Sequence, residues 1–580
     1  MRLHYLLLGL GQASGCRLPA EKPSDNSQSD YVILGAGPAG YVLATRLSED
    51  PTVTVILLEA GPDGSGDRNM YTPGFAGRLQ NSPYVWNYTS QPDPRRGGIA
   101  PRFPQGHALG GGTSVNFMSY SRGAASVYDQ WASDSGNERL AFHHLFEQFE
   151  RSTNLTVPSP TDYKHAAAPG AYGDGPVQVS YEWVATDTEP YFGDAMAASM
   201  SQPVHLLDPA TGHHIGRVNG GPHTIDLQTG RRSSAQVAYG MILSLRQNVN
   251  IITRAEATKI DIQNRQAVSV QYVAHDDQTN HTISARREII VSAGAIGSPK
   301  LLMLSGLGPR DHLQELGIPV VKEIPEMGNN LHNHHNAITM SQISEDIITA
   351  FKLRINASLL AEAEAEYEAT GRGPLSEILT SSYVTERPSD EFLDSINATF
   401  HKALPIDRPL LFYGYTTSPL LPNPGNVNVM SAFVCLLQPE APGYVRLASA
   451  DYRDAPLIFS NYWGSDADFA LVLYGYKKLR GVMASDILAP IVLQELYPGP
   501  DAQTDEEVTQ AMLDSAWSFN HPTGTCSLGR VLDPRFRISG IGGLRVVDTS
   551  VFPYQPTSHT SGPTYAVAEL AAKIIKEEWY

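Results

Sequence analysis

A glycine-rich turn between two short apolar runs constrains this chain more than any other feature. The run Asp30–Leu34 leads into Gly35-Ala36-Gly37-Pro38-Ala39-Gly40, residues 41–48 follow with helical spacing, and a second apolar run, 53–58, ends at Glu59. A strand, a tight turn, a helix and a second strand form one βαβ unit of a parallel sheet. The sequence therefore predicts a Rossmann-type fold that binds a dinucleotide.

Each residue type in this unit has a physical reason. Gly35 permits the tight turn, Gly37 lets the backbone approach a pyrophosphate, and Gly40 lets the helix pack closely on the strand. The helix that begins there directs N–H groups and the positive end of its dipole at the phosphates. Glu59 lies about 20 residues past the turn, where a carboxylate can accept hydrogen bonds from a ribose diol. The turn alone does not distinguish FAD from NAD.

The charge balance argues against several kinds of partner. Asp and Glu number 60 and Lys and Arg 42, which gives a net charge of −18. A polyanion repels phosphate backbones, so nucleic acid is not expected as a partner. The N-terminal apolar run, residues 5–11, is too short to span a bilayer, and no membrane span is expected.

The N-terminus has the layout of a secretory signal peptide. Arg2 precedes the apolar run, and small residues follow it up to Ala20, so residues 1–20 are predicted to be a signal peptide that directs the protein to the secretory pathway or outside the cell. An unstructured start of a cytosolic protein is the alternative. Cys16 lies within this segment, and the two other cysteines, Cys435 and Cys526, could pair. Sequons, which are possible glycan sites of a secreted glycoprotein, begin at Asn87, Asn154, Asn280, Asn356 and Asn397.

Three further blocks carry long, specific motifs. The first runs from Gly106 through Gly110-Gly111-Gly112-Thr113 to Gly123, and the second from Gly294 to Gly308. The third is C-terminal: residues 520–526, 543–550 and 557–560. Together with the N-terminal turn, these blocks resemble the glucose–methanol–choline (GMC) flavin oxidoreductases, from about Asp30 to the C-terminal helix. One departure is His107, where the family usually has Arg, Lys, Asn or Cys.

The resemblance implies an α/β fold, α+β overall, with two interleaved domains. A Rossmann-type FAD-binding domain would alternate with a substrate domain built on a mostly antiparallel sheet with helices. The predicted segments are 30–155, 226–325 and 511–580 for the FAD-binding domain, and 156–225 and 326–510 for the substrate domain. Residues 355–370 and the tail from Thr564 are predicted to be helical, and residues 21–29 to be an unstructured leader.

FAD is the cofactor that the resemblance implies. Some members attach it covalently through a His just before the Asn of the first signature; Val115 stands there in this chain, so noncovalent FAD is expected. Ala257, expected near the adenine, stands where the family commonly has Val. The predicted cofactor-binding residues are Gly35, Gly37, Pro38, Ala39, Gly40, Glu59, Ala60, Trp86, Gly110, Thr113, Asn116, Phe117, Met118, Ser119, Ala257, Asp548, Thr549 and Thr560.

Two histidines are the predicted catalytic residues. His521 lies in the family's His-Pro-x-Gly-Thr block, and His559 lies where members have His or Asn. An alcohol becomes a good hydride donor as its hydroxyl proton leaves, and a neutral imidazole can take that proton near neutral pH. The second histidine would orient the substrate oxygen, and the flavin would accept the hydride at N5.

The substrate stays open at this level, because a shared flavin site does not fix it. Oxidation of an aromatic or secondary-metabolite (polyketide-type) alcohol is the main hypothesis, with O₂ or a quinone-type compound as electron acceptor. The alternatives are a sugar oxidase or dehydrogenase and a non-redox lyase or cyclase that retains FAD. The polar stretch Thr560-Ser561-Gly562-Pro563, where members often have aliphatic residues, motivates the last. The histidine pair argues against a further possibility, a flavin-binding protein that catalyses no reaction.

Two other features have ordinary explanations. The tract Leu331-His332-Asn333-His334-His335-Asn336 resembles a metal-binding run, but it matches better a family segment that here begins at Gly328. No metal is therefore expected. Ser114 could suggest a nucleophile, but no elbow motif or ordered triad accompanies it.

Overall fold

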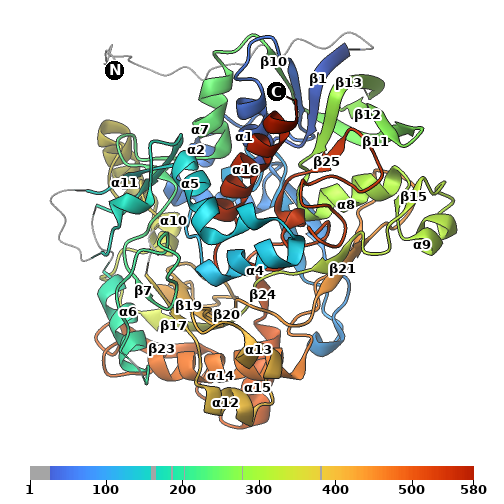
Figure 1. The fold of residues 1–580 in the computed structure, drawn as a ribbon. Helices are drawn as coiled ribbons and strands as arrows, with labels where there is room; N and C mark the ends of the chain where they lie inside the picture. The colour runs from blue at the N-terminus through green and yellow to red at the C-terminus, as the bar shows by residue number, and fades with distance from the viewer. Residues whose placement is uncertain are drawn as a thin grey trace.

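The protein is described from a computed structural model that covers residues 27–158, 165–183, 187–201, 203–276, 278–378 and 382–579. The predicted signal peptide, residues 1–20, and most of the predicted leader lie outside the described residues. Two seven-stranded sheets organise the fold, one in the upper and one in the lower half of the view in Figure 1.

The first sheet has a parallel centre. Its order is β10-β2-β1-β13-β12-β11, with β25 also paired to β13; the pairs among β10, β2, β1, β13 and β25 are parallel, and β11–β13 form an antiparallel meander. β2 and most of β1 are buried, as expected for strands covered on both faces. The bounds are β1 (Ser27–Leu34), β2 (Val55–Leu58), β10 (Val249–Ile252), β11 (Ala255–Gln263), β12 (Gln266–Ala274), β13 (Thr279–Val291) and β25 (Leu544–Val546).

Helices from distant parts of the chain cover this sheet. α16 lies beside α1 and α5 in the upper half of Figure 1. The buried carboxylate of Glu569 on α16 binds Arg46 of α1 (2.7 Å) and accepts a hydrogen bond from Tyr239 of α7 (2.9 Å). A buried charge needs such partners, and this set ties the C-terminal helix to the first βαβ unit. The bounds are α1 (Pro38–Leu47), α5 (Phe142–Ser152), α7 (Ala235–Leu243), α8 (Gly294–Leu304) and α16 (Ser561–Trp579).

The second sheet is antiparallel, with the order β23-β17-β20-β19-β18-β7 and β24 paired to β17. α14 (Asp466–Met483) packs on one face, where Tyr413 and Val434 are buried. Phe412 and Phe433, which alternate with them, point to the opposite face. The bounds are β7 (Gly216–Val218), β17 (His335–Ile343), β18 (Tyr383–Glu386), β19 (Leu411–Thr416), β20 (Val429–Leu436), β23 (Val492–Tyr497) and β24 (Trp517–Ser518).

The remaining elements are short or peripheral. The helices are α2 (Arg68–Tyr71), α3 (Gly112–Val115), α4 (Ala125–Ser135), α6 (Glu189–Ala198), α9 (Arg310–Glu315), α10 (Ala350–Ile355), α11 (Ala357–Thr370), α12 (Asp390–Ser395), α13 (Thr399–Ala403) and α15 (Asp505–Asp514). The strands are β3 (Val85–Thr89), β4 (Arg102–Gly106), β5 (Thr153–Thr156), β6 (Val177–Ser180), β8 (Ile225–Asp226), β9 (Arg231–Arg232), β14 (Leu307–Gly308), β15 (Lys322–Glu323), β16 (Asn329–Leu331), β21 (Gly443–Arg446) and β22 (Leu457–Phe459).

The fold confirms the predicted α/β architecture and both predicted helices, α11 and α16. The leader prediction was too long, because Ser27–Ser29 already belong to β1 and pair with β13. Whether Cys435 and Cys526 pair was open in the sequence; both are free and buried, Cys435 within β20. β24 lies beyond the predicted domain boundary at 510 and still pairs with the antiparallel sheet. In the described part of the chain, no helix combines the length and apolarity that crossing a bilayer requires.

Candidate active site

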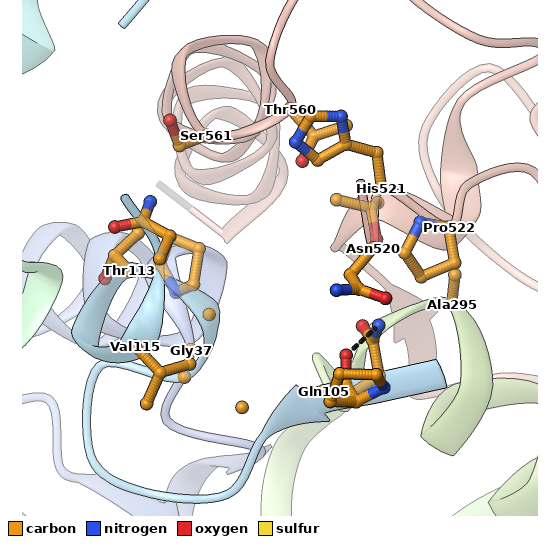
Figure 2. Close-up of a pocket in the computed structure, with 18 of the residues that line it drawn as sticks. Gly37, Gln105, Thr113, Val115, Ala295, Asn520, His521, Pro522, Thr560 and Ser561 are labelled. Atoms are coloured by element: carbon orange, nitrogen blue, oxygen red, sulfur yellow. Dashed lines mark hydrogen bonds between the residues drawn. The ribbon is translucent and has the colours of Figure 1, made fainter. Parts of the chain in front are cut away.

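A cavity of about 440 Å³ lies between the two sheets. In Figure 2 Gly37, Thr113 and Val115 lie on one side of the opening, and Asn520, His521 and Pro522 on the other. Every predicted site residue lines this cavity except Gly40 and Gly110. The cavity thus joins the glycine turn and the two predicted catalytic histidines, which lie far apart in sequence, in one space.

The glycines of the turn divide into two kinds. A Cβ on Gly35 would lie 2.4 Å from the Ser292 oxygen, and one on Gly40 would lie 2.0 Å from the Gly35 oxygen, so these two permit close packing of backbone. A Cβ on Gly37 would instead meet no atom within 4 Å and would project into the cavity. Gly37 caps α1 and no side chain bonds the exposed N–H groups there, which fits a pyrophosphate.

Gly110 was predicted to touch the cofactor, but it does not reach the cavity. Its φ is +87°, and a Cβ there would lie 2.1 Å from the Ser114 Oγ, so glycine is needed for the turn itself. The Ser114 hydroxyl donates to the Leu109 carbonyl (2.7 Å), which fits its reading as a structural residue. Neighbouring Gly111, Gly112 and Thr113 line the cavity in its place.

Glu59 is held at the cavity wall by two backbone donors. Its Oε2 accepts from the N–H of Ala36 and its Oε1 from the N–H of Gly61, both at 2.8 Å. Burial raises the pKa of Glu59 to about 7, although these two hydrogen bonds oppose the shift. Each carboxylate oxygen keeps a second lone pair, so the side chain can also accept from a diol in the cavity.

Asn116 is oriented by a residue that the sequence analysis missed. Arg232 is buried, and its Nη1 donates to the Asn116 side-chain oxygen (2.8 Å) and backbone oxygen (2.7 Å). The Met118 N–H also donates to that side-chain oxygen, at 3.1 Å. Burial lowers the pKa of Arg232 to about 9. With its oxygen occupied, Asn116 presents its amide N–H groups as donors at the cavity wall, which fits a flavin carbonyl.

The Asp548 carboxylate is already occupied by protein donors. It accepts from the Gly294 N–H (2.9 Å), the Ser298 hydroxyl (2.5 Å) and the Ser550 N–H (2.7 Å), and burial raises its pKa. These bonds fasten the C-terminal segment to the start of α8. We therefore expect any contact of Asp548 and Thr549 with the cofactor to come mainly from backbone groups.

His521 and His559 face each other across the end of the cavity. Their ring centroids are 5.2 Å apart and the rings are nearly perpendicular, at 85°. The backbone of His521 is clamped: its N–H donates to Asn333 (2.9 Å), and its carbonyl accepts from Gln555 (3.1 Å). The His521 Nδ1 lies 2.9 Å from the Nδ1 of His334. No described residue hydrogen-bonds the His521 Nε2, which leaves that atom for a ligand.

Electrostatics keep both rings neutral. Burial lowers the pKa of His559 to about 4. Burial, followed by His559 and His334, lowers the pKa of His521 well below its ordinary value. A neutral imidazole has an unprotonated ring nitrogen, so each ring can accept a proton or a hydrogen bond at neutral pH.

An aromatic wall surrounds the histidine pair. Phe412 lies 5.9 Å from His559, and Phe519 lies 5.5 Å from His521 and 5.9 Å from His559, measured between ring centroids. Tyr383 stacks on Phe412 (4.6 Å), and Phe433 packs against Phe519 (5.3 Å). This wall was not predicted from the sequence. The alternation of apolar residues in β18–β20 was a usable signal, but it does not say which face meets the cavity.

The histidine tract does not converge on one point. His332 Nε2 lies 3.1 Å from Asn330 Oδ1, His334 contacts His521, and His335 Nε2 bonds the Ser460 hydroxyl at 2.6 Å. The three rings therefore have separate partners. Within the described ranges, three or more His, Cys, Asp or Glu side chains bring their ligand atoms within 4.8 Å of one another only at His401, Glu440 and Asp468, away from the cavity.

His107, the one departure in the first signature, lies outside the cavity lining. Its ring packs on Trp86 with centroids 3.9 Å apart, and its Nδ1 lies 3.3 Å from the Pro83 carbonyl. The departure therefore changes the support of Trp86, which does line the cavity, and adds no polar group to it.

Comparison with known proteins places this geometry in context. Two family models described as GMC oxidoreductase match residues 29–336 and 439–568. The chain is 32% identical over its whole length to the full-length glucose-methanol-choline family oxidoreductase mfmG of Annulohypoxylon moriforme. It is also 32% identical to an oxygen-dependent choline dehydrogenase of Chromohalobacter salexigens, over 95% of this chain and 96% of that one.

Solved structures show the same fold. An FAD-dependent oxidoreductase from Chaetomium thermophilum superposes with a TM-score of 0.85 at 27% identity, covering 95% of this chain and 99% of the other. A fungal aryl-alcohol oxidase gives a TM-score of 0.82 at 25% identity, covering 96% of this chain and all of the other.

Glu59→Gln tests the cofactor site. The amide would set an NH₂ group against one of two backbone N–H donors and would lose an acceptor for the ribose. We expect FAD affinity to fall about 10- to 100-fold, since a hydrogen bond to a charged group contributes about 1.5–3 kcal/mol. FAD released by heat denaturation, measured after dialysis, reports the bound fraction. The exposed Glu323→Gln variant is the control; equal FAD retention in both variants would contradict the assignment.

His214→Gln tests the burial of neutral histidine. Burial, with His559 nearby, lowers the pKa of His214 to about 3. The unfolded chain takes up this proton below about pH 6.5 and the folded chain does not, so stability is lost as pH falls toward 3. The drop in melting temperature from about pH 7.5 to about pH 5 should be smaller in His214→Gln than in wild type. The exposed neighbour His213→Gln should match wild type; an equal drop in all three would refute the assignment.

Proposed function

The chain belongs to the GMC oxidoreductase family, a family of FAD-dependent enzymes, and from this premise we propose that it oxidises an alcohol to a carbonyl with His521 as the base. The observation that carries the proposal is the pair of neutral rings, His521 and His559, 5.2 Å apart at the end of the cavity that begins at the glycine turn. FAD supplies the electron acceptor when bound, because its flavin takes the hydride from the carbinol carbon.

The residues of this chain handle the proton. His521 Nε2 accepts the hydroxyl proton of the alcohol, so that the carbinol carbon becomes a strong hydride donor. The lowered pKa of His521 keeps it unprotonated and ready at neutral pH. The clamp on its backbone by Asn333 and Gln555 fixes where the ring enters the cavity. Fixed geometry of this kind lowers the entropic cost of the reaction.

His559 holds the substrate oxygen from the other side. Its ring is nearly perpendicular to that of His521, so an oxygen between them can contact a nitrogen of each ring. The His559 backbone N–H donates to the Ser121 hydroxyl at 3.1 Å, which fixes its segment. Because its pKa is about 4, His559 remains neutral and acts through a hydrogen bond rather than a charge.

We propose an aromatic alcohol of the secondary-metabolite kind as substrate. The wall formed by Tyr383, Phe412, Phe433 and Phe519 offers stacking and edge contacts to a ring. A sugar would need a polar partner for each hydroxyl, and this wall offers few, which favours the aromatic alcohol over the sugar alternative. The similarity to an aryl-alcohol oxidase supports the same class.

We also propose noncovalent FAD and reoxidation by O₂ or a quinone-type compound. Val115, which lines the cavity beside Thr113, has no atom that could bond to the flavin (Figure 2). FAD should therefore appear in the supernatant after heat denaturation; flavin that stays with the precipitated chain would refute this. Peroxide formation in air, compared with quinone reduction, separates the two acceptors.

His521→Ala tests the base. Anaerobic flavin reduction by an aryl alcohol should slow by about 10²- to 10⁴-fold, the usual contribution of a general base. FAD should remain bound, because the cofactor site is untouched. Stopped-flow absorbance of the flavin measures the rate, with the exposed His213→Ala as control. A rate within a few-fold of wild type would show that another group takes the proton, and rapid bleaching in wild type would exclude the non-redox lyase or cyclase.

Phe412→Leu tests the substrate class. An aromatic contact contributes about 0.5–1.5 kcal/mol, so KM for an aryl alcohol should rise about 2- to 10-fold. The maximal reduction rate should change much less, because the histidine pair stays in place. KM for a short aliphatic alcohol should not rise, and Phe400→Leu, a change at a half-exposed residue outside the cavity, should behave as wild type. An equal rise for both substrates would contradict an aromatic preference.

A further inference from the structure

We propose that His334, a residue outside the cavity, is the positioning residue that fixes the ring tautomer of His521 and so places the basic lone pair on Nε2, facing the substrate. The inference rests on the proposed function of His521 as a base. Its evidence is a chain of two hydrogen bonds that runs from a backbone carbonyl through His334 to His521.

The first bond determines which nitrogen of His334 carries the proton. His334 Nε2 lies 3.2 Å from the backbone oxygen of Leu437. A carbonyl oxygen only accepts, so Nε2 must carry the hydrogen. His334 is buried, and burial, followed by His559, lowers its pKa to about 3, so its other nitrogen, Nδ1, is unprotonated at neutral pH. His334 therefore acts toward His521 as an acceptor.

The second bond determines which nitrogen of His521 carries the proton. The two Nδ1 atoms lie 2.9 Å apart, and one of them must donate. Since the Nδ1 of His334 can only accept, the Nδ1 of His521 carries the hydrogen, and a neutral His521 is left with its lone pair on Nε2. The opposite tautomer would place two lone pairs against each other at this distance and would turn an N–H, rather than a base, toward the cavity.

The chain also limits where the proton can go. If His521 passed its Nδ1 proton to His334, then His334 would have to release its Nε2 proton. The acceptors that the described residues offer to His334 are the carbonyl oxygens of Leu437 and Pro556, which cannot take it. The proton removed from the alcohol therefore stays on His521 until it leaves through the cavity. When His521 is protonated, its Nδ1–H becomes a stronger donor to the Nδ1 of His334.

Among the residues that the structure describes, no acid near this pair could replace His334. The titratable groups that influence His521 are His559 and His334, and those that influence His334 are His559 and His214; all are histidines. The carbonyl oxygens of Leu437 and Pro556 favour a proton on His334 but do not outweigh burial. Among the described residues, no carboxylate hydrogen-bonds either ring. Within the described part of the chain, the ring of His521 is therefore supported by a neutral acceptor and by no carboxylate.

Three substitutions of similar size separate the roles. All three, His334→Leu, His334→Asn and His334→Asp, lose the bond to Leu437, so differences among them report only on the His521 side. The Oδ1 of Asn or Asp can replace Nδ1 as the acceptor, whereas Leu offers none. The measurement is anaerobic flavin reduction by an aryl alcohol as a function of pH, with FAD content measured as the readout of folding.

The three variants should differ in rate and in pH dependence. His334→Leu should slow reduction by about 10- to 100-fold, a part of the 10²–10⁴ that a base contributes, and Asn should restore most of the rate. Asp adds a negative charge that raises the pKa of His521, so reduction should fall as pH drops through that higher pKa. Wild type and Asn should show no such fall between about pH 6 and about pH 8, because the pKa of His521 lies below this range. His335→Asn, which changes a ring bonded to Ser460, is the control.

Three outcomes decide the matter. Equal rates in Leu and Asn, together with an unshifted profile in Asp, would overturn the role of His334 while His521→Ala remained inactive. Wild-type rates in both His521→Ala and the His334 variants would instead refute the proposed function. If His334→Leu does not retain FAD, the Asn–Asp pair still decides through the pH profile, since the two side chains differ mainly in charge.

Discussion

A short antiparallel ladder between residues 332–336 and 517–523 fixes the position of His521, the proposed base. The Phe519 N–H donates to the His334 carbonyl (3.0 Å), and His332 and Thr523 exchange two backbone bonds (3.1 and 3.0 Å). His521 lies between these rungs, in a segment that then turns to the C-terminal strand region, where the Cys526 N–H bonds the Ser550 carbonyl (2.8 Å). Because one side of the ladder continues into β17, the base lies at the junction of the two sheets, where the cavity ends.

Buried, neutral histidines at this junction can accept a proton, and they also lower the stability of the folded state in acid. Burial lowers the pKa of His214 and His223 to about 3 and of His559 to about 4, so the rings stay unprotonated at neutral pH. An unprotonated ring is what proton abstraction needs. The same desolvation opposes protonation of these histidines in the folded state, whereas in the unfolded chain they take up protons freely. The free energy of unfolding therefore falls as the pH drops. Readiness for catalysis and sensitivity to acid therefore have one physical cause.

Features formed by residues close together in the sequence were predicted better than contacts between residues far apart in it. The glycine turn and Glu59 were predictable because the spacing within a βαβ unit reflects local backbone geometry. His521 and His559 were predicted from their place in blocks that resemble the family. Gly111 and Gly112 line the cavity and Gly110 does not, which the sequence could not show because a glycine run does not reveal which member faces the cavity. Arg232 and Phe412 were missed because their roles depend on strands that meet only after the chain has folded. The tract at His334 was recognised as a family segment, but its contact with His521 joins residues that are far apart in sequence.

The central claim is that an alcohol loses a proton to His521 and a hydride to the flavin. The most direct measurement is anaerobic stopped-flow reduction of the bound FAD by an aryl alcohol and by the same alcohol deuterated at the carbinol carbon. We expect rapid bleaching of the flavin with the unlabelled alcohol and a several-fold slower rate with the deuterated one, because the C–H bond breaks in that step. A flavin that stays oxidised while product forms, or a rate insensitive to deuterium together with unaltered reduction in His521→Ala, would contradict it.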